Sequence, residues 1–169
     1  MISAYCLSYG NWTVIPAHWD YVFEDMVNCG FDAVALSFSE SEERYAMCCF
    51  EQQVKAAHHH GLKVLAIPSR IGGRFAGAPF MPSPWLLSHP ESQVPGHPGL
   101  ACLEDKVFLK RVEEFIRFIV EDFGVDGIIW DEPKGLEVIC KHPATLARFG
   151  EEPTEEDMHQ SMFNFIENL

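Results

Sequence analysis

The sequence is poor in basic residues and in long apolar runs. Its 169 residues include 12 Lys and Arg against 25 Asp and Glu, so the formal net charge is -13 at pH 7. Nucleic acids and anionic lipid surfaces would repel such a chain, and we therefore expect no nucleic-acid partner and no membrane partner. No apolar run approaches the roughly 18 residues that span a bilayer. The opening stretch MISAYCLSYGNW lacks the basic and apolar regions of a secretory signal.

The sequence also lacks recognisable metal-binding motifs. Its six cysteines form none of the CxxC pairs typical of zinc sites, and most lie within apolar runs, where a free cysteine behaves as a small hydrophobic residue. This usage favours a reducing compartment, so we expect a cytoplasmic protein. Three consecutive histidines, 58–60, point in three directions on a helix and do not converge on one ion. The sequence therefore predicts no metal site and no cofactor.

What the sequence does contain is a repeated strand pattern. Residues 29–40, 60–70 and 123–133 each combine a Gly, a short apolar run and a polar end, and another apolar segment, 3–9, opens the chain. Apolar runs of about five residues suit strands that are buried on both faces, as in parallel sheets. The first three strands recur at about thirty residues, which matches one βα unit.

Helical patterns fill the intervals between these strands. Apolar residues recur at helical spacing over 19–29, 45–59 and 105–122, and a further helix is predicted to start near Glu155. Alternation of strands and helices indicates an α/β fold with a parallel sheet. We expect residues 1–169 to form a single domain.

A long loop, residues 70–104, is predicted after the third strand. It is rich in Pro and Gly and carries Trp85 and His89. Long loops in compact domains are often binding loops or lids, and this one leaves the carboxyl end of a strand, where parallel α/β folds bind their ligands. We therefore predict Trp85 and His89 as substrate-binding residues, with simple surface packing as the alternative.

Two segments resemble a known family. The stretch HPE, followed by ACLEDKVFLKRVEEFIRFIVEDFGVDGIIWDEP, resembles the third-to-fourth unit of glycoside hydrolases of the (β/α)8 TIM-barrel type, and HPATLARFG resembles the segment after their fourth strand. The resemblance implies a partial (β/α)8 TIM barrel of about four βα units, corresponding to the N-terminal half, and a carbohydrate substrate. Such barrels usually take a further catalytic carboxylate from a later strand. The resemblance thus implies a missing C-terminal half-barrel, a homodimer that completes one barrel, or a fold that closes differently without hydrolysis.

Two adjacent carboxylates, Asp131 and Glu132, follow the fourth strand. Glycoside hydrolysis needs one carboxylic acid and a second carboxylate several ångströms away. Neighbouring strand residues point to opposite faces, so these two are not expected to be that pair by themselves. The resemblance favours Asp131 as nucleophile or charge stabiliser and Glu132 as acid/base or positioning neighbour. The plainer alternative is a solvated strand end before a proline turn.

Other strand ends supply predicted substrate contacts. Tyr9, Asn11 and Trp12 follow the first strand, where an aromatic ring can stack on a sugar or simply cover the rim. Ser39 ends the second strand, and Arg70 ends the third, where it binds substrate or pairs with a carboxylate.

Two other functions remain open at this point. One is a non-catalytic carbohydrate-binding or assembly module that kept the strand-end aromatic residues. The other is a metal-dependent sugar isomerase or aldolase-type barrel. Such sites collect Glu, Asp and His from several strand ends, and the strand ends here offer carboxylates but no well-placed histidine.

Overall fold

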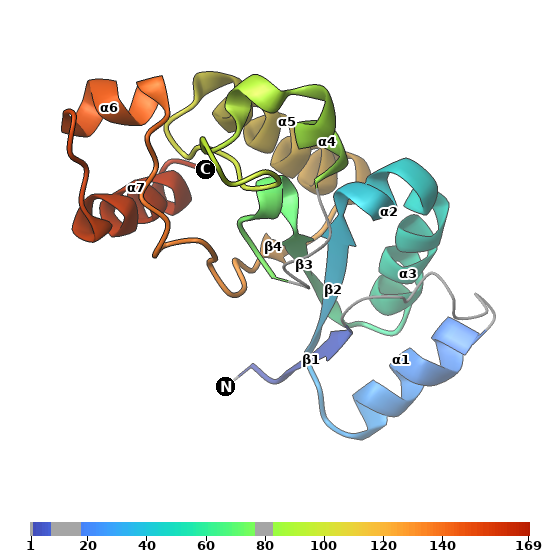
Figure 1. Ribbon diagram of the computed structural model, residues 1–169. Coiled ribbons are helices and arrows are strands. Elements are labelled where there is room, and N and C mark those ends of the chain that lie inside the picture. The colour runs from blue at the N-terminus through green and yellow to red at the C-terminus, as the bar shows by residue number, and fades with distance from the viewer. Residues whose placement is uncertain (1, 8–17, 77–82) are drawn as a thin grey trace. The chain divides into compact units, whose positions relative to one another are not determined.

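Figure 1 shows a computed structural model of the chain, which describes residues 2–7, 18–76 and 83–169. These residues divide into two units: residues 1–69 with 117–129 form unit 1, and residues 70–116 with 130–169 form unit 2. The predicted single domain stays a prediction. Within the described ranges, no helix is long and apolar enough to cross a membrane.

Unit 1 is built on a four-stranded parallel sheet whose strand order is the order of the chain. The strands are β1 (Ala4–Leu7), β2 (Ala33–Ser39), β3 (Lys63–Ser69) and β4 (Gly127–Ile128). All pairings are parallel, which confirms the predicted α/β class with a parallel sheet. All seven residues of β2 are buried, as expected for an inner strand covered on both faces.

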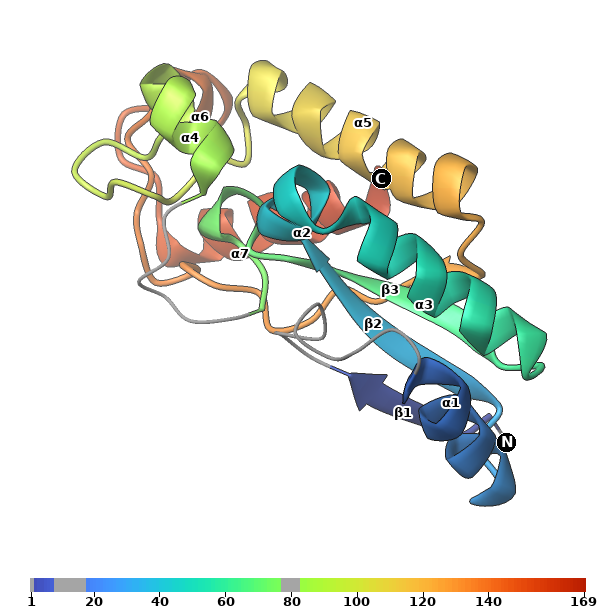
Figure 2. The same cartoon turned by 90° about the vertical axis from the view of Figure 1, so that its right-hand side faces the viewer.

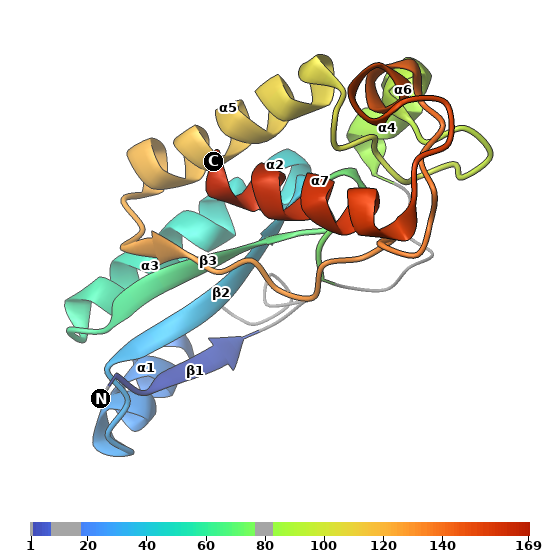
Figure 3. The same cartoon turned by 90° about the vertical axis from the view of Figure 1, so that its left-hand side faces the viewer.

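Helices α1 (Trp19–Asn28) and α3 (Met47–His59) lie on one face of this sheet (Figures 2 and 3). The short helix α2 (Glu40–Tyr45) precedes α3, and the last turns of α5 (Lys106–Phe123) also belong to unit 1. The helix predicted over 45–59 starts later because Ala46, at φ -141°, separates α2 from α3. Four phenylalanine rings pack together in the core, with centroid distances of 4.5 to 6.3 Å: Phe38, Phe50, Phe118 and Phe123.

Strand β4 is shorter and more exposed than the sequence predicts. Its apolar run suggested the middle of a buried strand, but only Gly127 and Ile128 pair with β3, and both are only partly buried. The backbone leaves the extended conformation at Glu132, which has a φ of 43°. The predicted alternation of side chains through Asp131 and Glu132 is therefore wrong, because it requires an extended strand at those positions.

Unit 2 consists mainly of short helices and loops. The predicted 70–104 loop contains η3 (Ile71–Gly73), α4 (Pro84–Ser88) and η4 (Pro90–Ser92), with an isolated antiparallel bridge between Gln93 and Ala101. The first part of α5 is followed later in the chain by α6 (Pro143–Phe149) and α7 (Glu155–Glu167), the helix predicted near Glu155. The aromatic core of unit 2 has contacting rings with centroids 4.7 to 6.0 Å apart. It consists of Phe75, Phe108, Trp130 and Phe165.

Arg74 joins separate loops of unit 2 from the inside. The side chain is 3% exposed; its Nε donates to the carbonyl of Ala101 at 2.7 Å, and its Nη1 donates to the carbonyls of Lys134 and Gly135 at 3.3 and 3.2 Å. Burial lowers the pKa of Arg74 to about 10, so the guanidinium stays charged at neutral pH. A buried cation of this kind is stable only when its donors are satisfied.

The loop beside Arg74 depends on a close backbone approach. Gly73 has a φ of 69°, and a Cβ atom there would lie 2.1 Å from the carbonyl oxygen of Gly99. Only glycine fits both the positive φ and the contact.

In unit 1, Asp126 ties the start of β4 to α3 and β3. Its Oδ2 accepts hydrogen bonds from the backbone N–H of Val64 at 2.8 Å and from His58 Nε2 at 2.9 Å. The Val64 N–H, followed by the hydrogen bond from His58, lowers the pKa of Asp126. His60 makes a comparable contact of 3.2 Å with Asp20.

We expect Asp126→Asn to lower the free energy of unfolding at pH 7 by up to about 1 kcal/mol, because the side chain is partly exposed. A depressed folded-state pKa means that the unfolded chain binds more protons, so this contribution is present above the unfolded value of about 3.9 and is lost as pH falls below it. Urea unfolding between pH 3 and 7 measures the difference. Asp122→Asn, which changes an exposed carboxylate, is the control. If it lowers the free energy of unfolding as much as Asp126→Asn does, and with the same pH dependence, the role assigned to Asp126 is contradicted.

We expect Arg74→Leu to cost about 3 kcal/mol or more of unfolding free energy, because the buried carbonyl of Ala101 and the partly buried carbonyls of Lys134 and Gly135 each lose a donor. Arg117→Leu on exposed α5 removes a 3.9 Å ion pair with Glu121 and is expected to cost about 0.5 kcal/mol or less. Urea titration of both variants gives the comparison, and similar losses would show that Arg74 has no special structural role.

Candidate active site

The carboxyl ends of β2 and β3 carry a cluster of buried hydroxyl groups. Ser37 Oγ lies 2.6 Å from Ser69 Oγ, and both side chains are at most 5% exposed. Ser39 lies opposite Ser69 in the strand register. This edge of the sheet is therefore polar inside, at the position where parallel α/β folds bind ligands.

Ser39, a predicted substrate contact, forms the N-cap of α2. Its Oγ accepts a hydrogen bond from the backbone N–H of Ser41 at 3.1 Å, and its own N–H donates to Glu42 Oε2 at 2.7 Å. Its hydroxyl also contacts Glu42, which completes a capping box. The Ser-x-x-Glu spacing was visible in the sequence, and it accounts for Ser39 without a ligand. The substrate-binding role stays a prediction.

Glu40 starts α2 and is only 4% exposed. An acidic residue at this position suits the positive end of the helix dipole. Its burial at the end of β2 distinguishes it from the solvent-facing carboxylates that normally fill such positions.

In unit 2, Asp131 and Glu132 differ in their surroundings. The backbone carbonyl of Asp131 accepts a hydrogen bond from the backbone N–H of Ala76 at 3.0 Å, and Asp131 as a whole is partly buried. The side chain of Glu132 is 64% exposed and lies 3.0 Å from Lys134 Nζ. Asp131 is therefore the more enclosed of the two carboxylates.

Arg70 and Glu132 both have a left-handed backbone, with φ of 55° and 43°. Arg70 directly follows β3, which ends at Ser69, whereas Glu132 lies further along the chain from the end of β4 at Ile128. A residue other than glycine is strained in this conformation, and such strained residues cluster at functional sites. The Arg70 N–H also donates to the carbonyl of Phe75 at 2.7 Å, which closes the loop around η3.

Trp85 and His89 lie together on α4 and the residue after it. Their rings stack with centroids 4.1 Å apart and an angle of 9° between the planes, and His89 Nδ1 lies 3.0 Å from the carbonyl oxygen of Trp85. Both residues are partly buried. The two residues predicted to bind substrate in the long loop therefore stack on each other.

The remaining predictions concern the N-terminal strand end and metal binding. Tyr9, Asn11 and Trp12 lie outside the described residues. Across the described ranges, no three His, Cys, Asp or Glu side chains are grouped so as to hold a metal ion.

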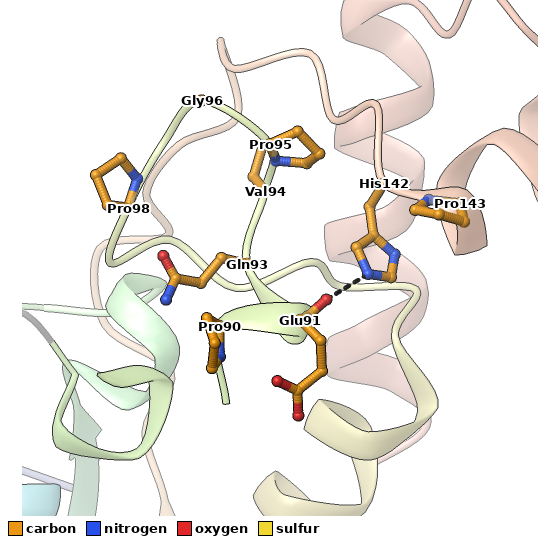
Figure 4. A pocket seen from close by; sticks show the side chains of 9 residues that line it. All are labelled: Pro90, Glu91, Gln93, Val94, Pro95, Gly96, Pro98, His142 and Pro143. Carbon is orange, nitrogen blue, oxygen red and sulfur yellow. Dashed lines mark hydrogen bonds between the residues drawn. The ribbon is translucent and has the colours of Figure 1, made fainter. Parts of the chain in front are cut away.

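A surface pocket in unit 2 was not predicted. It encloses about 570 Å³ between the loop Pro90–Pro98 and the start of α6 (Figure 4). His142 Nε2 donates to the carbonyl of Glu91 at 2.8 Å, while its Nδ1 accepts from the N–H of Ala144 and caps α6. The sequence has three His-Pro steps, at 89–90, 97–98 and 142–143, and each contributes at least one residue to the lining. Their gathering at one pocket cannot be inferred from spacing.

The fold is similar to that of two solved glycoside hydrolases. It matches a noncanonic maltogenic alpha-amylase, AmyB from Thermotoga neapolitana, with a TM-score of 0.56 and 15% identity over 75% of this chain. It matches the beta-galactosidase from the psychrophilic Marinomonas ef1 with a TM-score of 0.61 and 16% identity over 88% of this chain. The chain spans 38% and 24% of the lengths of these two proteins.

Comparisons with protein-family models and with curated proteins found no match to this chain. At identities of 15 and 16%, the two structural matches show a shared fold. The predicted resemblance to glycoside hydrolases is therefore confirmed at the level of a glycosidase-like α/β fold.

Proposed function

We propose that this chain is the N-terminal part of a glycosidase-like hydrolase with a (β/α)8 barrel, and that it acts on glycosidic bonds. The observation that carries the proposal is the match to two sugar-cleaving enzymes over 75 and 88% of the chain. The parallel sheet β1-β2-β3-β4 supports it, because consecutive strands of such a barrel are also spatial neighbours.

The residues proposed for catalysis and substrate binding each follow or end a strand at its carboxyl end. Barrel enzymes draw their catalytic residues from several strand ends. In unit 2, Asp131 and Glu132 follow β4 and Arg70 follows β3; in unit 1, Ser39 ends β2. We assign Arg70 and Ser39 to substrate binding.

We assign Asp131 as nucleophile or charge stabiliser, since Glu132 already contacts Lys134. In glycoside hydrolysis, a carboxylic acid protonates the leaving oxygen while a carboxylate attacks the sugar carbon or activates water. Glu132 then serves as acid/base or positions Asp131. The remaining carboxylate comes from a strand that completes the barrel, supplied by a C-terminal half-barrel or by a second copy.

The second candidate is carbohydrate binding without hydrolysis. The stacked pair of Trp85 and His89 favours it, because a rigid aromatic surface can pack against the apolar face of a sugar ring. Binding of this kind does not require Asp131.

We expect Asp131→Asn to reduce turnover at least about 100-fold, because the amide can neither attack nor stabilise positive charge at the sugar carbon. Chromogenic α-glucosides and β-galactosides measure the loss, assayed with a protein in which a second copy or a C-terminal half-barrel completes the barrel. Glu151→Gln, an exposed carboxylate between α6 and α7, is the matched control and should keep full activity.

Unchanged turnover in Asp131→Asn would contradict the catalytic assignment. If the wild-type chain shows no turnover but a sugar raises its melting temperature equally in wild type and Asp131→Asn, the hydrolase proposal fails for this chain. The binding function is then supported.

We expect Glu132→Gly to raise the free energy of unfolding by about 1 kcal/mol, because glycine adopts a positive φ without strain. If Glu132 also takes part in catalysis, the same variant gains stability while losing turnover. Glu132→Gln keeps the side-chain length and the strain, so its stability should not rise. Equal stability of the three proteins in urea would contradict the assigned strain.

A further inference from the structure

Two cysteines from distant segments meet in the core of unit 2. Thr145 Oγ1 donates to Cys140 Sγ at 3.1 Å and lies 3.3 Å from Cys102 Sγ, so one oxygen contacts both sulfur atoms. Cys102 is fully buried and Cys140 is 2% exposed. Both pack with Val94 and Met158, and the N–H of Cys140 points to Met158 Sδ at 3.3 Å.

The surroundings of the two sulfur atoms are unequal. A hydrogen bond from Cys102 lowers the pKa of the Cys140 thiol, and the Thr145 hydroxyl, the backbone N–H of His142 and the charge of Arg74 act in the same direction. The hydrogen bond with Cys140, together with burial, raises the pKa of Cys102. A thiolate beside a protonated thiol is the arrangement of a nucleophile with its resolving partner.

The pocket of Figure 4 shares Val94 with the buried cluster that holds this pair, and neither cysteine is among the residues that line it. His142, which also lines the pocket, is two residues from Cys140 in the sequence. Its volume of about 570 Å³ is in the range of small-molecule sites. Glu91 is the one charged residue among those that line it.

We propose that Cys102 and Cys140 form a dithiol site that a low-molecular-weight disulfide oxidises from the side of this pocket. The Cys140 thiolate attacks one sulfur of the reagent, and the other leaves as a thiolate that takes up a proton. Cys102 then loses its proton and attacks Cys140 Sγ, which releases the second thiol. In balance, two protein thiols are oxidised to one disulfide while the reagent disulfide is reduced to two thiols.

The oxidised site ties the segment before α5 to the segment before α6. A disulfide that closes a loop of this length restricts the unfolded chain and therefore raises the melting temperature. This inference does not rest on the proposed hydrolase function, because none of its residues belongs to the proposed active site.

The test is exposure of the native chain to cystamine at pH 7.5, followed by acid quench, alkylation and peptide mapping by mass spectrometry. We expect peptides containing Cys102 and Cys140 to become joined, with the loss of two hydrogen atoms, and the chain to melt several degrees higher. Reduction with dithiothreitol should restore both thiols. Exposed Cys29 and Cys48 report reagent access and should carry only mixed disulfides.

Variants separate the two sulfur roles. In Cys102→Ala, the mixed disulfide between Cys140 and cystamine should accumulate, because the resolving thiol is absent. In Cys140→Ser, Cys102 should stay unmodified. Thr145→Val removes a hydrogen-bond donor and should slow modification of Cys140 several-fold at pH 7.5, with less effect above pH 9, where the thiolate forms without help.

The proposal is overturned if Cys140 reacts only at urea concentrations that unfold the chain, while Cys29 and Cys48 react at once. It is also overturned if Cys140 forms a mixed disulfide in the wild type that Cys102 never resolves. If Cys140→Ser fails to fold, Cys102→Ala still tests the proposal. Accumulation of the mixed disulfide between Cys140 and cystamine in that variant requires the Cys140 thiol to be the nucleophile.

Discussion

Each polar group at the carboxyl end of β2 has to find its partner inside the protein, because all seven residues of this strand are buried. A buried hydroxyl without a partner costs about 1–3 kcal/mol. Ser37 meets this requirement by bonding to Ser69, and Ser39 meets it by capping α2. The strand therefore passes directly into a helix, and Glu40 is buried at the junction as a result. The shape of the proposed sugar-binding edge follows from how these hydroxyl groups are satisfied.

In unit 2, buried polar groups find their partner in a cation, the guanidinium of Arg74. The unit has little regular structure to pair its carbonyl groups, and Arg74 supplies donors to three of them at once. The guanidinium remains charged because burial lowers its pKa only to about 10. The same charge favours the thiolate form of Cys140. One buried arginine thus stabilises the loops and also tunes the sulfur chemistry beside them.

Much of the fold was predictable because its signals are local. The helices predicted over 19–29 and 105–122 formed within a residue or so of those bounds, since an amphipathic period and a nearby partner surface agree there. Strand β4 was overestimated because its apolar run does not reveal that the backbone turns at Glu132.

The candidate site was predicted less completely than the fold. The carboxylates after β4 stand out in the sequence, but Arg74 looks like one more basic residue in a Gly-rich loop. The contact of Cys102 with Thr145, which also bonds to Cys140, joins segments that no periodic pattern in the sequence relates. The same is true of the hydrogen bond between His58 and Asp126. Such contacts arise from tertiary packing, which one sequence alone does not display.

The contact between Gly73 and the carbonyl of Gly99 has a further consequence, for the recognition of relatives. With structural matches at 15 and 16% identity, overall similarity is a weak guide to which proteins share this loop. A sterically required glycine is a sharper criterion, since a Cβ atom at position 73 would lie only 2.1 Å from the Gly99 carbonyl oxygen and the φ there is positive. A protein that aligns a glycine with Gly73 and an arginine with Arg74 has the means to build the same loop, whereas a bulky residue at position 73 would mark a different course of the chain.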